Sequence, residues 1–263
     1  MQSSQRLAAG IEYDGTAYHG WQHQPHAPSI QEELNRAFSV VAAEPVECVG
    51  AGRTDAGVHA TGQVAHFDTS VVRAPRSWLL GANSTLPADI NVLWVRPVSN
   101  EFHARYSATS RSYQYLILNR QVRSALQRDR AWWVYQPLDH ERMHIAAQQL
   151  LGKHDFSAFR ASHCQSPTPV RIITHIEVSR VDDYLHIICT ANAFLHHMVR
   201  NIVGSLVRVG QKKESVEWLG EVLRDADRTL SGITAPATGL SLTRVEYPAK
   251  LLAHREDRNS DLA

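Results

Sequence analysis

Residues 50–67 read GAGRTDAGVHATGQVAHF, an arginine, threonine and aspartate triplet followed by a glycine turn and alternating strand-like residues. Gly57 allows a sharp turn after Asp55, and Arg53 stands two residues earlier, on the same side of an extended backbone. A neighbouring guanidinium favours the ionised carboxylate and can orient it. Such a carboxylate can act as a nucleophile or a base. The same pattern also fits a structural role, in which Asp55 bonds the turn backbone and Arg53 is a surface partner.

Apolar periodicity around this stretch predicts alternating strands and helices. Ser29 and Glu32 have capping-box spacing, so a helix should begin at Ile30. The other elements expected in the first half are strands 6–14, 45–50, 62–68 and 90–98 and a helix over 75–86. In the second half we expect strands 111–119, 131–136, 170–181, 184–192 and 241–247 and helices 140–151, 193–210 and 215–223.

Short β connections favour antiparallel sheets backed by helices, which is the α+β class. A chain of 263 residues is long enough for two lobes. We expect an N-terminal lobe over 1–100 that carries the Asp55 loop, a C-terminal lobe over 101–248, and a polar tail over 249–263.

The composition is that of an ordinary globular protein, with 43% hydrophobic and 20% charged residues. No stretch approaches the roughly 18 apolar residues of a membrane span, and the first residues lack a signal-peptide core. We therefore expect a cytoplasmic protein without membrane association. The three cysteines, Cys48, Cys164 and Cys189, are far apart in sequence, which favours buried thiols over disulfides or a zinc site.

The net charge is only +1, but the charge distribution is uneven. Between Arg96 and Arg130 seven arginines stand against Glu101 and Asp129. A basic stripe of this kind predicts contacts with phosphates, as in a nucleic-acid-binding protein. A solvated strand face whose arginines pair with acids elsewhere explains it equally well.

Motifs for bound cofactors are missing from the sequence. It has no G-x-G-x-x-G or Walker loop, so we expect no nucleotide cofactor. His196 and His197 lie within the predicted helix 193–210, where adjacent side chains diverge by about 100° and do not easily share one ion. We therefore expect no metal site there, and assign no chemistry to His59 or His66.

The stretch 50–67 resembles the motif of the tRNA pseudouridine synthase A family. Five further blocks resemble the same family in the same order: YDGTAYHGWQHQP at 13–25, FHARYSATSRSYQYLI at 102–117, DFSAFR at 155–160, FLHHMVRNIVGSL at 194–206 and GLSLTRVEYP at 239–248. The resemblance thus extends over about residues 6–248.

This resemblance implies an enzyme that isomerises uridine to pseudouridine at positions 38, 39 and 40 of the tRNA anticodon stem-loop, without cofactor or metal. It implies that Asp55 is the nucleophile, attacking C6 of the base or C1′ of the ribose, or abstracting a ribose proton. The target nucleotide must first be flipped out of its stack.

The other site residues also follow from the resemblance. Arg53 would pair with Asp55 and help to hold the flipped nucleotide. Tyr113 would stack on the uracil and could take the C5 proton, and Leu240 would form an apolar wall for the base. Read without the family, Tyr113 and Tyr115 fit the core of a sheet, and Leu240 fits an ordinary core position.

The family further implies the pseudouridine synthase fold, with two similar ferredoxin-like or RRM-like α/β lobes, a central antiparallel sheet and a cleft between the lobes. It also implies a homodimer that binds one tRNA across both subunits. Two rival functions are an RNA-binding module or chaperone without chemistry, and a histidine-rich metal hydrolase.

Overall fold

The computed structural model describes residues 4–162 and 164–252, which form two compact units. The first unit contains the chain up to Thr109 and the chain from Leu242 onward, and the second contains Ser110–Ser241. The chain therefore crosses between the units later than the junction near Asn100 that we expected. The final strand, which we expected in the second lobe, is divided between the units, and most of it belongs to the first.

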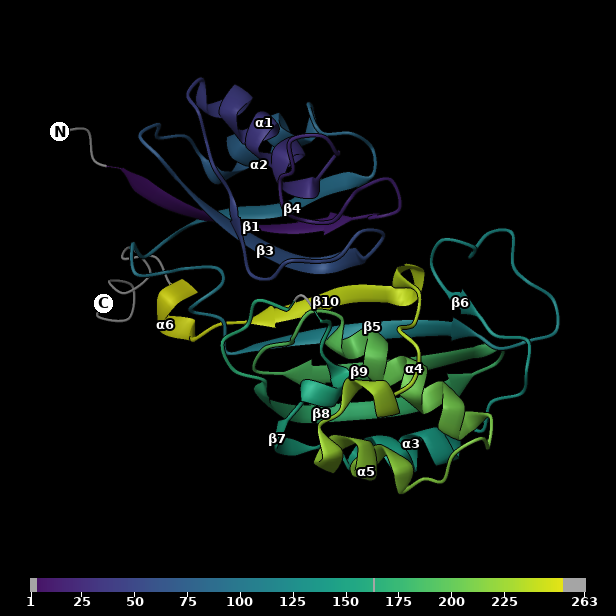
Figure 1. Cartoon of the computed structure of the whole chain (residues 1–263). Coiled ribbons are helices and arrows are strands. Elements are labelled where there is room, and N and C mark those ends of the chain that lie inside the picture. Colours follow the sequence, from purple (N-terminus) through teal and green to yellow (C-terminus); the bar gives the residue numbers. More distant parts are fainter. Residues whose placement is uncertain (1–3, 163, 253–263) are drawn as a thin grey trace, which may run out of the picture. The chain divides into compact units, whose positions relative to one another are not determined.

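The first unit is built on an antiparallel sheet with β1 (Gln5–Tyr13) in its centre. β1 pairs with β3 (His59–Thr69) on one side and β4 (Ile90–Val98) on the other. The short β2 (Val49–Gly50) pairs with Ala65 and His66 of β3, and β10 (Leu240–Glu246) is the next strand after β3 (Figure 1). β4 has the bounds we expected, whereas β2 is much shorter than the expected strand 45–50.

Helices α1 (Ile30–Ala42) and α2 (Pro75–Asn83) cover one face of this sheet (Figure 1). α1 begins where the capping box predicts, and the Ser29 side chain accepts a hydrogen bond from the Glu32 backbone N–H. The ring of Phe38 lies 4.4 Å from that of Phe67 and 6.3 Å from that of Trp78, centroid to centroid. These rings form the core between helices and sheet.

The opposite face of the same sheet is also covered. Phe102 and Tyr247, whose ring centroids lie 4.9 Å apart, pack there with Ala8, Val64 and Leu251. Leu251 belongs to α6 (Ala249–Leu252), the described part of the tail that we expected over 249–263; the rest of that tail lies outside the described residues.

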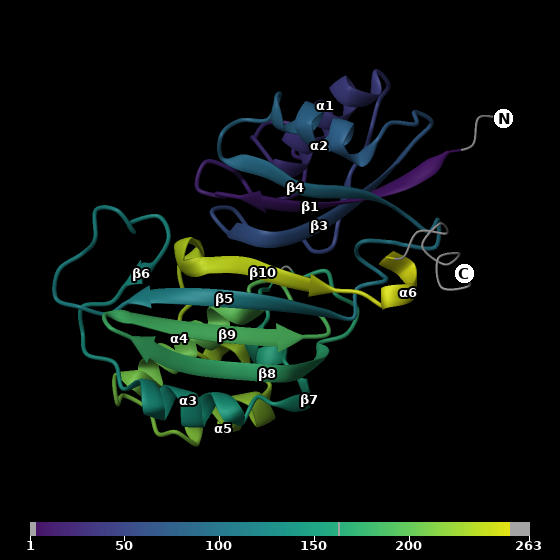
Figure 2. The same ribbon diagram turned by 180° about the vertical axis from the view of Figure 1, so that it is seen from behind.

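The second unit has its own antiparallel sheet, in the order β5-β9-β8-β7. The bounds of its strands are β5 (Ser110–Leu118), β7 (Gly152–Asp155), β8 (Val170–Val181) and β9 (Tyr184–Ala191). Buried and partly exposed residues alternate along β9, as expected for a sheet with one covered face. β8 and β9 run side by side in this sheet (Figure 2). β6 (Trp132–Trp133) pairs in parallel with β5 and is shorter than the expected strand 131–136.

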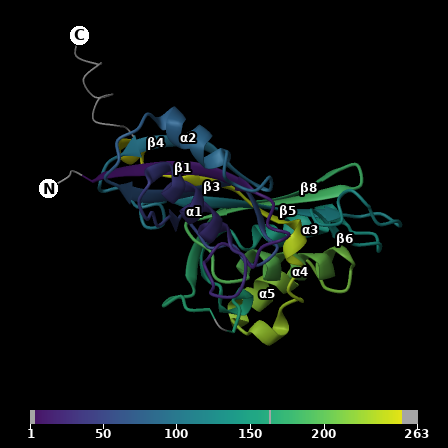
Figure 3. The same ribbon diagram turned by 90° about the horizontal axis from the view of Figure 1, so that it is seen from above.

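Helices α3 (His140–Gln148), α4 (Met198–Gly210) and α5 (Trp218–Asp225) lie together in this unit (Figure 3). α4 is buried over almost its whole length, while α3 packs on β8. The expected start of α4 at residue 193 is wrong, because His197 has a left-handed backbone with φ 62° and the helix begins after it. The described residues of this unit also include three short 3-10 turns: η1 (Ser157–Phe159), η2 (Arg228–Leu230) and η3 (Ala237–Gly239).

Helices packed on mostly antiparallel sheets confirm the α+β class. Within residues 4–162 and 164–252, every helix is too short or too polar to cross a bilayer.

Candidate active site

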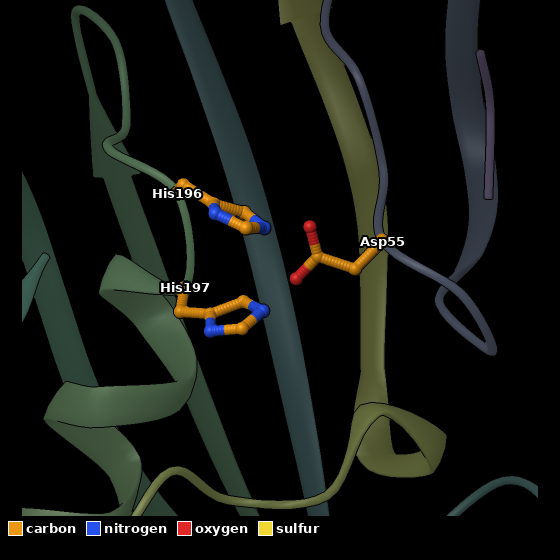
Figure 4. Close-up of side chains that lie close together, drawn as sticks. All are labelled: Asp55, His196 and His197. Carbon is orange, nitrogen blue, oxygen red and sulfur yellow. The ribbon is translucent and has the colours of Figure 1, made fainter. Parts of the chain in front are cut away.

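Asp55 lies on the loop between β2 and β3, and its side chain extends from that loop (Figure 4). The turn predicted after it is present, since the Val58 N–H donates to the Asp55 carbonyl over 3.1 Å and Gly57 has a φ of +76°. Asp55 is half-buried, whereas Arg53 is exposed. A half-buried carboxylate on a tight turn is suited to meeting a substrate.

The segment 13–21 of the same unit holds this loop by backbone hydrogen bonds. The Trp21 N–H donates to the Thr54 carbonyl over 3.0 Å, and the Gly57 N–H donates to the Tyr18 carbonyl over 3.3 Å. Gly20 has a φ of +96°, and a Cβ there would lie 2.5 Å from the Thr54 carbonyl oxygen. Glycine is therefore required at this close approach. The sequence blocks 13–25 and 50–67 therefore fold against each other in the first unit.

The expected ion pair between Arg53 and Asp55 is not among those recorded within residues 4–162 and 164–252. Arg53 is an exposed residue, and within this part of the chain it makes no side-chain hydrogen bond or ion pair. The pairing of Arg53 with Asp55 stays a prediction.

Tyr113 and Tyr115 belong to β5 in the second unit and share the covered face of its sheet. The Tyr115 ring is completely buried, and its hydroxyl donates to the Pro236 carbonyl over 2.7 Å. This confirms Tyr115 as a packing residue. Tyr113 is 9% exposed, and its ring meets that of Phe194 edge-on at 5.0 Å.

Leu240 follows η3 and opens β10, with 6% of its surface exposed. The segment before it is tied to α4 through Arg228, whose guanidinium donates to the Asn201 side chain over 3.1 Å and to the Gly232 carbonyl over 3.1 Å. Asn201 also accepts from the Thr234 hydroxyl over 2.7 Å. These bonds fix the chain that leads to Leu240.

His196 and His197 lie directly before α4, not within it. Their ring centroids are 4.0 Å apart with an interplanar angle of 39° (Figure 4). The expectation that the two side chains diverge is therefore wrong, because the left-handed backbone at His197 replaces the helical geometry on which it rested.

His59 and His66 serve the packing of the first unit. The Nδ1 atom of His59 accepts from the Gly15 N–H over 3.1 Å and lies 3.1 Å from a carboxylate oxygen of Asp14. The Nδ1 atom of His66 accepts from the Ala104 N–H over 3.1 Å. Burial lowers the pKa of His66 to about 4, so its ring is neutral near pH 7.

The arginines between residues 96 and 130 do not form one exposed stripe. Arg111 is buried and donates to the Asn192 carbonyl over 2.8 Å. Arg96 and Arg105 belong to the first unit, where Arg96 lies over the Trp94 ring at 4.4 Å. The other four arginines of this stretch are exposed and lie on the loop 119–131 of the second unit; they are Arg120, Arg123, Arg128 and Arg130.

Comparison with known proteins places the chain in a family. The model of the tRNA pseudouridine synthase family matches residues 9–107 and 146–248. The chain belongs to the tRNA pseudouridine synthase family. It is 54% identical to tRNA pseudouridine synthase A of Pseudoalteromonas atlantica over 243 residues, covering 92% of each chain. It is 55% identical to tRNA pseudouridine synthase A of Aeromonas hydrophila over 246 residues, covering 94% of this chain and 91% of the relative.

A third tRNA pseudouridine synthase A, from Hydrogenovibrio crunogenus, is 52% identical over 242 residues, with 92% of each chain covered. The match to the tRNA pseudouridine synthase family includes Arg53, Asp55 and Leu240. Tyr113 and the basic loop 119–131 fall between the two matched segments.

One contact near Asp55 was not predicted from the sequence. Thr54, inside the motif itself, is buried, and its hydroxyl lies 2.8 Å from the Tyr13 hydroxyl. The only sequence signal is that the two residues belong to separate blocks of the same resemblance, at 13–25 and 50–67.

Proposed function

We propose that this member of the family isomerises uridine to pseudouridine in tRNA, at positions 38, 39 and 40 of the anticodon stem-loop. Family membership supports the reaction and the RNA substrate. The observation that carries the proposal is Asp55, a half-buried acid on a loop held by backbone hydrogen bonds.

The reaction exchanges one glycosidic bond for another. The C1′–N1 bond breaks, the uracil turns, and a C1′–C5 bond forms, while C5 loses a proton and N1 gains one. No electrons are gained or lost, so carboxylate chemistry is sufficient. In this proposal Asp55 attacks C6 of the base or C1′ of the ribose, or abstracts a ribose proton.

Three other side chains are proposed to act on the flipped nucleotide. Arg53 would hold the nucleotide, which its exposed guanidinium supports, and would orient Asp55 once the substrate is bound. Tyr113 would stack on the uracil and accept the C5 proton. Leu240 would provide an apolar wall for the base, which its position after the fixed segment 228–239 supports.

The exposed arginines of the loop 119–131 are proposed to contact tRNA phosphates. Apart from Arg111 the basic side chains of the region face solvent, although Arg120 and Arg128 lie 3.4 Å and 3.1 Å from Asp183 and Asp129. We also propose that the enzyme works in the cytoplasm as a homodimer whose lobes enclose the target nucleotide in a cleft.

The decisive experiment uses an unmodified tRNA transcript labelled with tritium at C5 of uridine. Tritium release measures turnover, and mapping of pseudouridine by reverse transcription locates the products. Asp55→Asn should abolish turnover and leave tRNA affinity within about twofold, because it removes nucleophilicity but little contact area. Asp155→Asn is the matched control, since Asp155 is an exposed acid whose carboxylate accepts from the Ser157 N–H over 2.8 Å.

Three outcomes would contradict the proposal. Appreciable turnover by Asp55→Asn would remove that residue from the chemistry. Tight tRNA binding without any product by the unaltered protein would favour an RNA-binding module. Stoichiometric zinc on elemental analysis, with activity lost to chelators, would favour the metal hydrolase.

A further inference from the structure

A chain of buried hydrogen bonds lies behind the Asp55 loop, entirely within the first unit. The Thr54 and Tyr13 hydroxyl oxygens are 2.8 Å apart, and these residues are 6% and 4% exposed. Gln63 on β3 is completely buried, and its amide nitrogen lies 3.5 Å from the Tyr13 hydroxyl. The same nitrogen donates to the Gly52 carbonyl over 2.9 Å.

Two kinds of hydrogen bond make up this chain. The Gln63 amide nitrogen donates to the Tyr13 hydroxyl, and the Tyr13 and Thr54 hydroxyls share a hydrogen bond in which either oxygen can be the donor. Burial raises the pKa of Tyr13 to about 12, so this hydroxyl keeps its proton near neutral pH. The chain therefore stays intact over the pH range in which the enzyme would work.

These bonds restrain the backbone on both sides of Arg53. Gln63 holds the Gly52 carbonyl, and Tyr13 holds the Thr54 side chain. The Thr54 carbonyl is held separately by the Trp21 N–H. Because side chains alternate in extended backbone, an inward Thr54 directs the next side chain, Asp55, away from the packed interior.

We propose that Tyr13, Thr54 and Gln63 are positioning residues for Asp55, which set the direction of its carboxylate through the backbone that precedes it. This inference rests on the proposed function of Asp55. None of the three is a catalytic residue. A displacement of about 1 Å at a reacting group can lower the rate by roughly a hundredfold. Loss of the Thr54 hydroxyl should therefore lower kcat without changing tRNA affinity.

The test compares variants that differ only in the buried hydroxyl. Thr54→Val keeps the side-chain shape and removes the hydroxyl, and we expect kcat to fall about 10- to 100-fold with KM for tRNA within about twofold. Thr54→Ser keeps the hydroxyl and should restore kcat to within about threefold of the unaltered enzyme. Tyr13→Phe breaks the same bond from the other side and should lower kcat similarly.

Thr69→Val is the matched control in the same unit. Thr69 is a buried threonine on β3 whose hydroxyl donates to Glu44 over 2.6 Å, far along the strand from Gln63. The Thr69→Val variant should have a lower free energy of unfolding and an unchanged kcat, which distinguishes a positioning role from general destabilisation. In the double variant Tyr13→Phe/Thr54→Val, kcat should fall no further than in the worse single variant, because both changes remove one shared bond.

The positioning role is overturned if folded Thr54→Val retains kcat within about twofold, or if Thr69→Val loses kcat to the same extent as Thr54→Val. If Thr54→Val does not fold, Tyr13→Phe decides by the same criteria. Asp55→Asn separates the two proposals. Turnover in that variant refutes the proposed function, whereas an inactive Asp55→Asn beside a fully active Thr54→Val refutes only the positioning role.

Discussion

Replacing Gly20 by alanine tests how the loop that carries Asp55 is held. Gly20 has a φ of +96°, and its new Cβ would lie 2.5 Å from the Thr54 carbonyl oxygen. A non-glycine residue in such backbone costs about 1–3 kcal/mol. Crowding a packed backbone adds about 1–3 kcal/mol. We therefore expect Gly20→Ala to lower the free energy of unfolding by about 2–6 kcal/mol.

Gly152→Ala is the matched control. Gly152 has a φ of +98°, but the nearest atom to its new Cβ would be Nε2 of His154, at 3.5 Å. Gly152→Ala introduces the backbone strain without the close approach, and should lower the free energy of unfolding by about 1–3 kcal/mol. The entropy that alanine removes from the unfolded chain is the same in both variants and cancels in the comparison.

Urea unfolding followed by circular dichroism measures both variants, and tritium release measures kcat. Gly20→Ala should lower kcat by about tenfold or more, since the displaced carbonyl belongs to the residue before Asp55. Gly152→Ala should leave kcat unchanged. Equal losses of stability together with unaltered kcat in both variants would refute the idea that the 13–21 segment holds the Asp55 loop.

Two further predictions concern pH and salt. The pKa of His66 is about 4 in the folded protein, below the ordinary value of about 6.5. The neutral His66 ring therefore contributes fully to the free energy of unfolding above about pH 6.5, and this contribution is lost as the pH falls toward 4. His66→Asn keeps an acceptor for the Ala104 N–H, and it should remove up to about 3 kcal/mol of this pH dependence. The prediction is contradicted if the free energy of unfolding in urea depends on pH in the same way in the variant and the unaltered enzyme. Arg123→Ala should weaken tRNA binding and reduce the slope of log K against log salt by about one, whereas Lys153→Ala, an exposed cation on β7, should not. Filter-binding titrations over a range of salt concentrations decide this, and equal slopes for Arg123→Ala and the unaltered enzyme would exclude Arg123 from the RNA surface.

Elements with a strong local signal were predicted well. β4 has the expected bounds, 90–98, and α1 begins at Ile30 after its Ser29 cap. The hairpin of β8 and β9 turns at Asp182 and Asp183 as expected. Alternation, capping and turn residues act between near neighbours in the chain, so the sequence alone contains the information that these elements need.

Elements that depend on distant partners were predicted less well. The apolar pattern of 193–210 extends into residues that are not helical, because His197 adopts a left-handed backbone before α4. Along β3, Gln63–Phe67 are all buried, since helices cover one face and residues from the end of the chain cover the other. Periodicity cannot distinguish this strand from one with a solvated face.

By itself the sequence determined the α+β class, the family resemblance and Asp55 as the acid to test, because a motif and its turn are local properties of the chain. Only the tertiary structure decided that Arg111 is buried, that the rings of His196 and His197 lie side by side, and that Thr54 bonds Tyr13. Burial and hydrogen bonding of a side chain depend on which remote segments fold against it. Tyr13 and Thr54 are 41 residues apart in the chain, and only folding joins them.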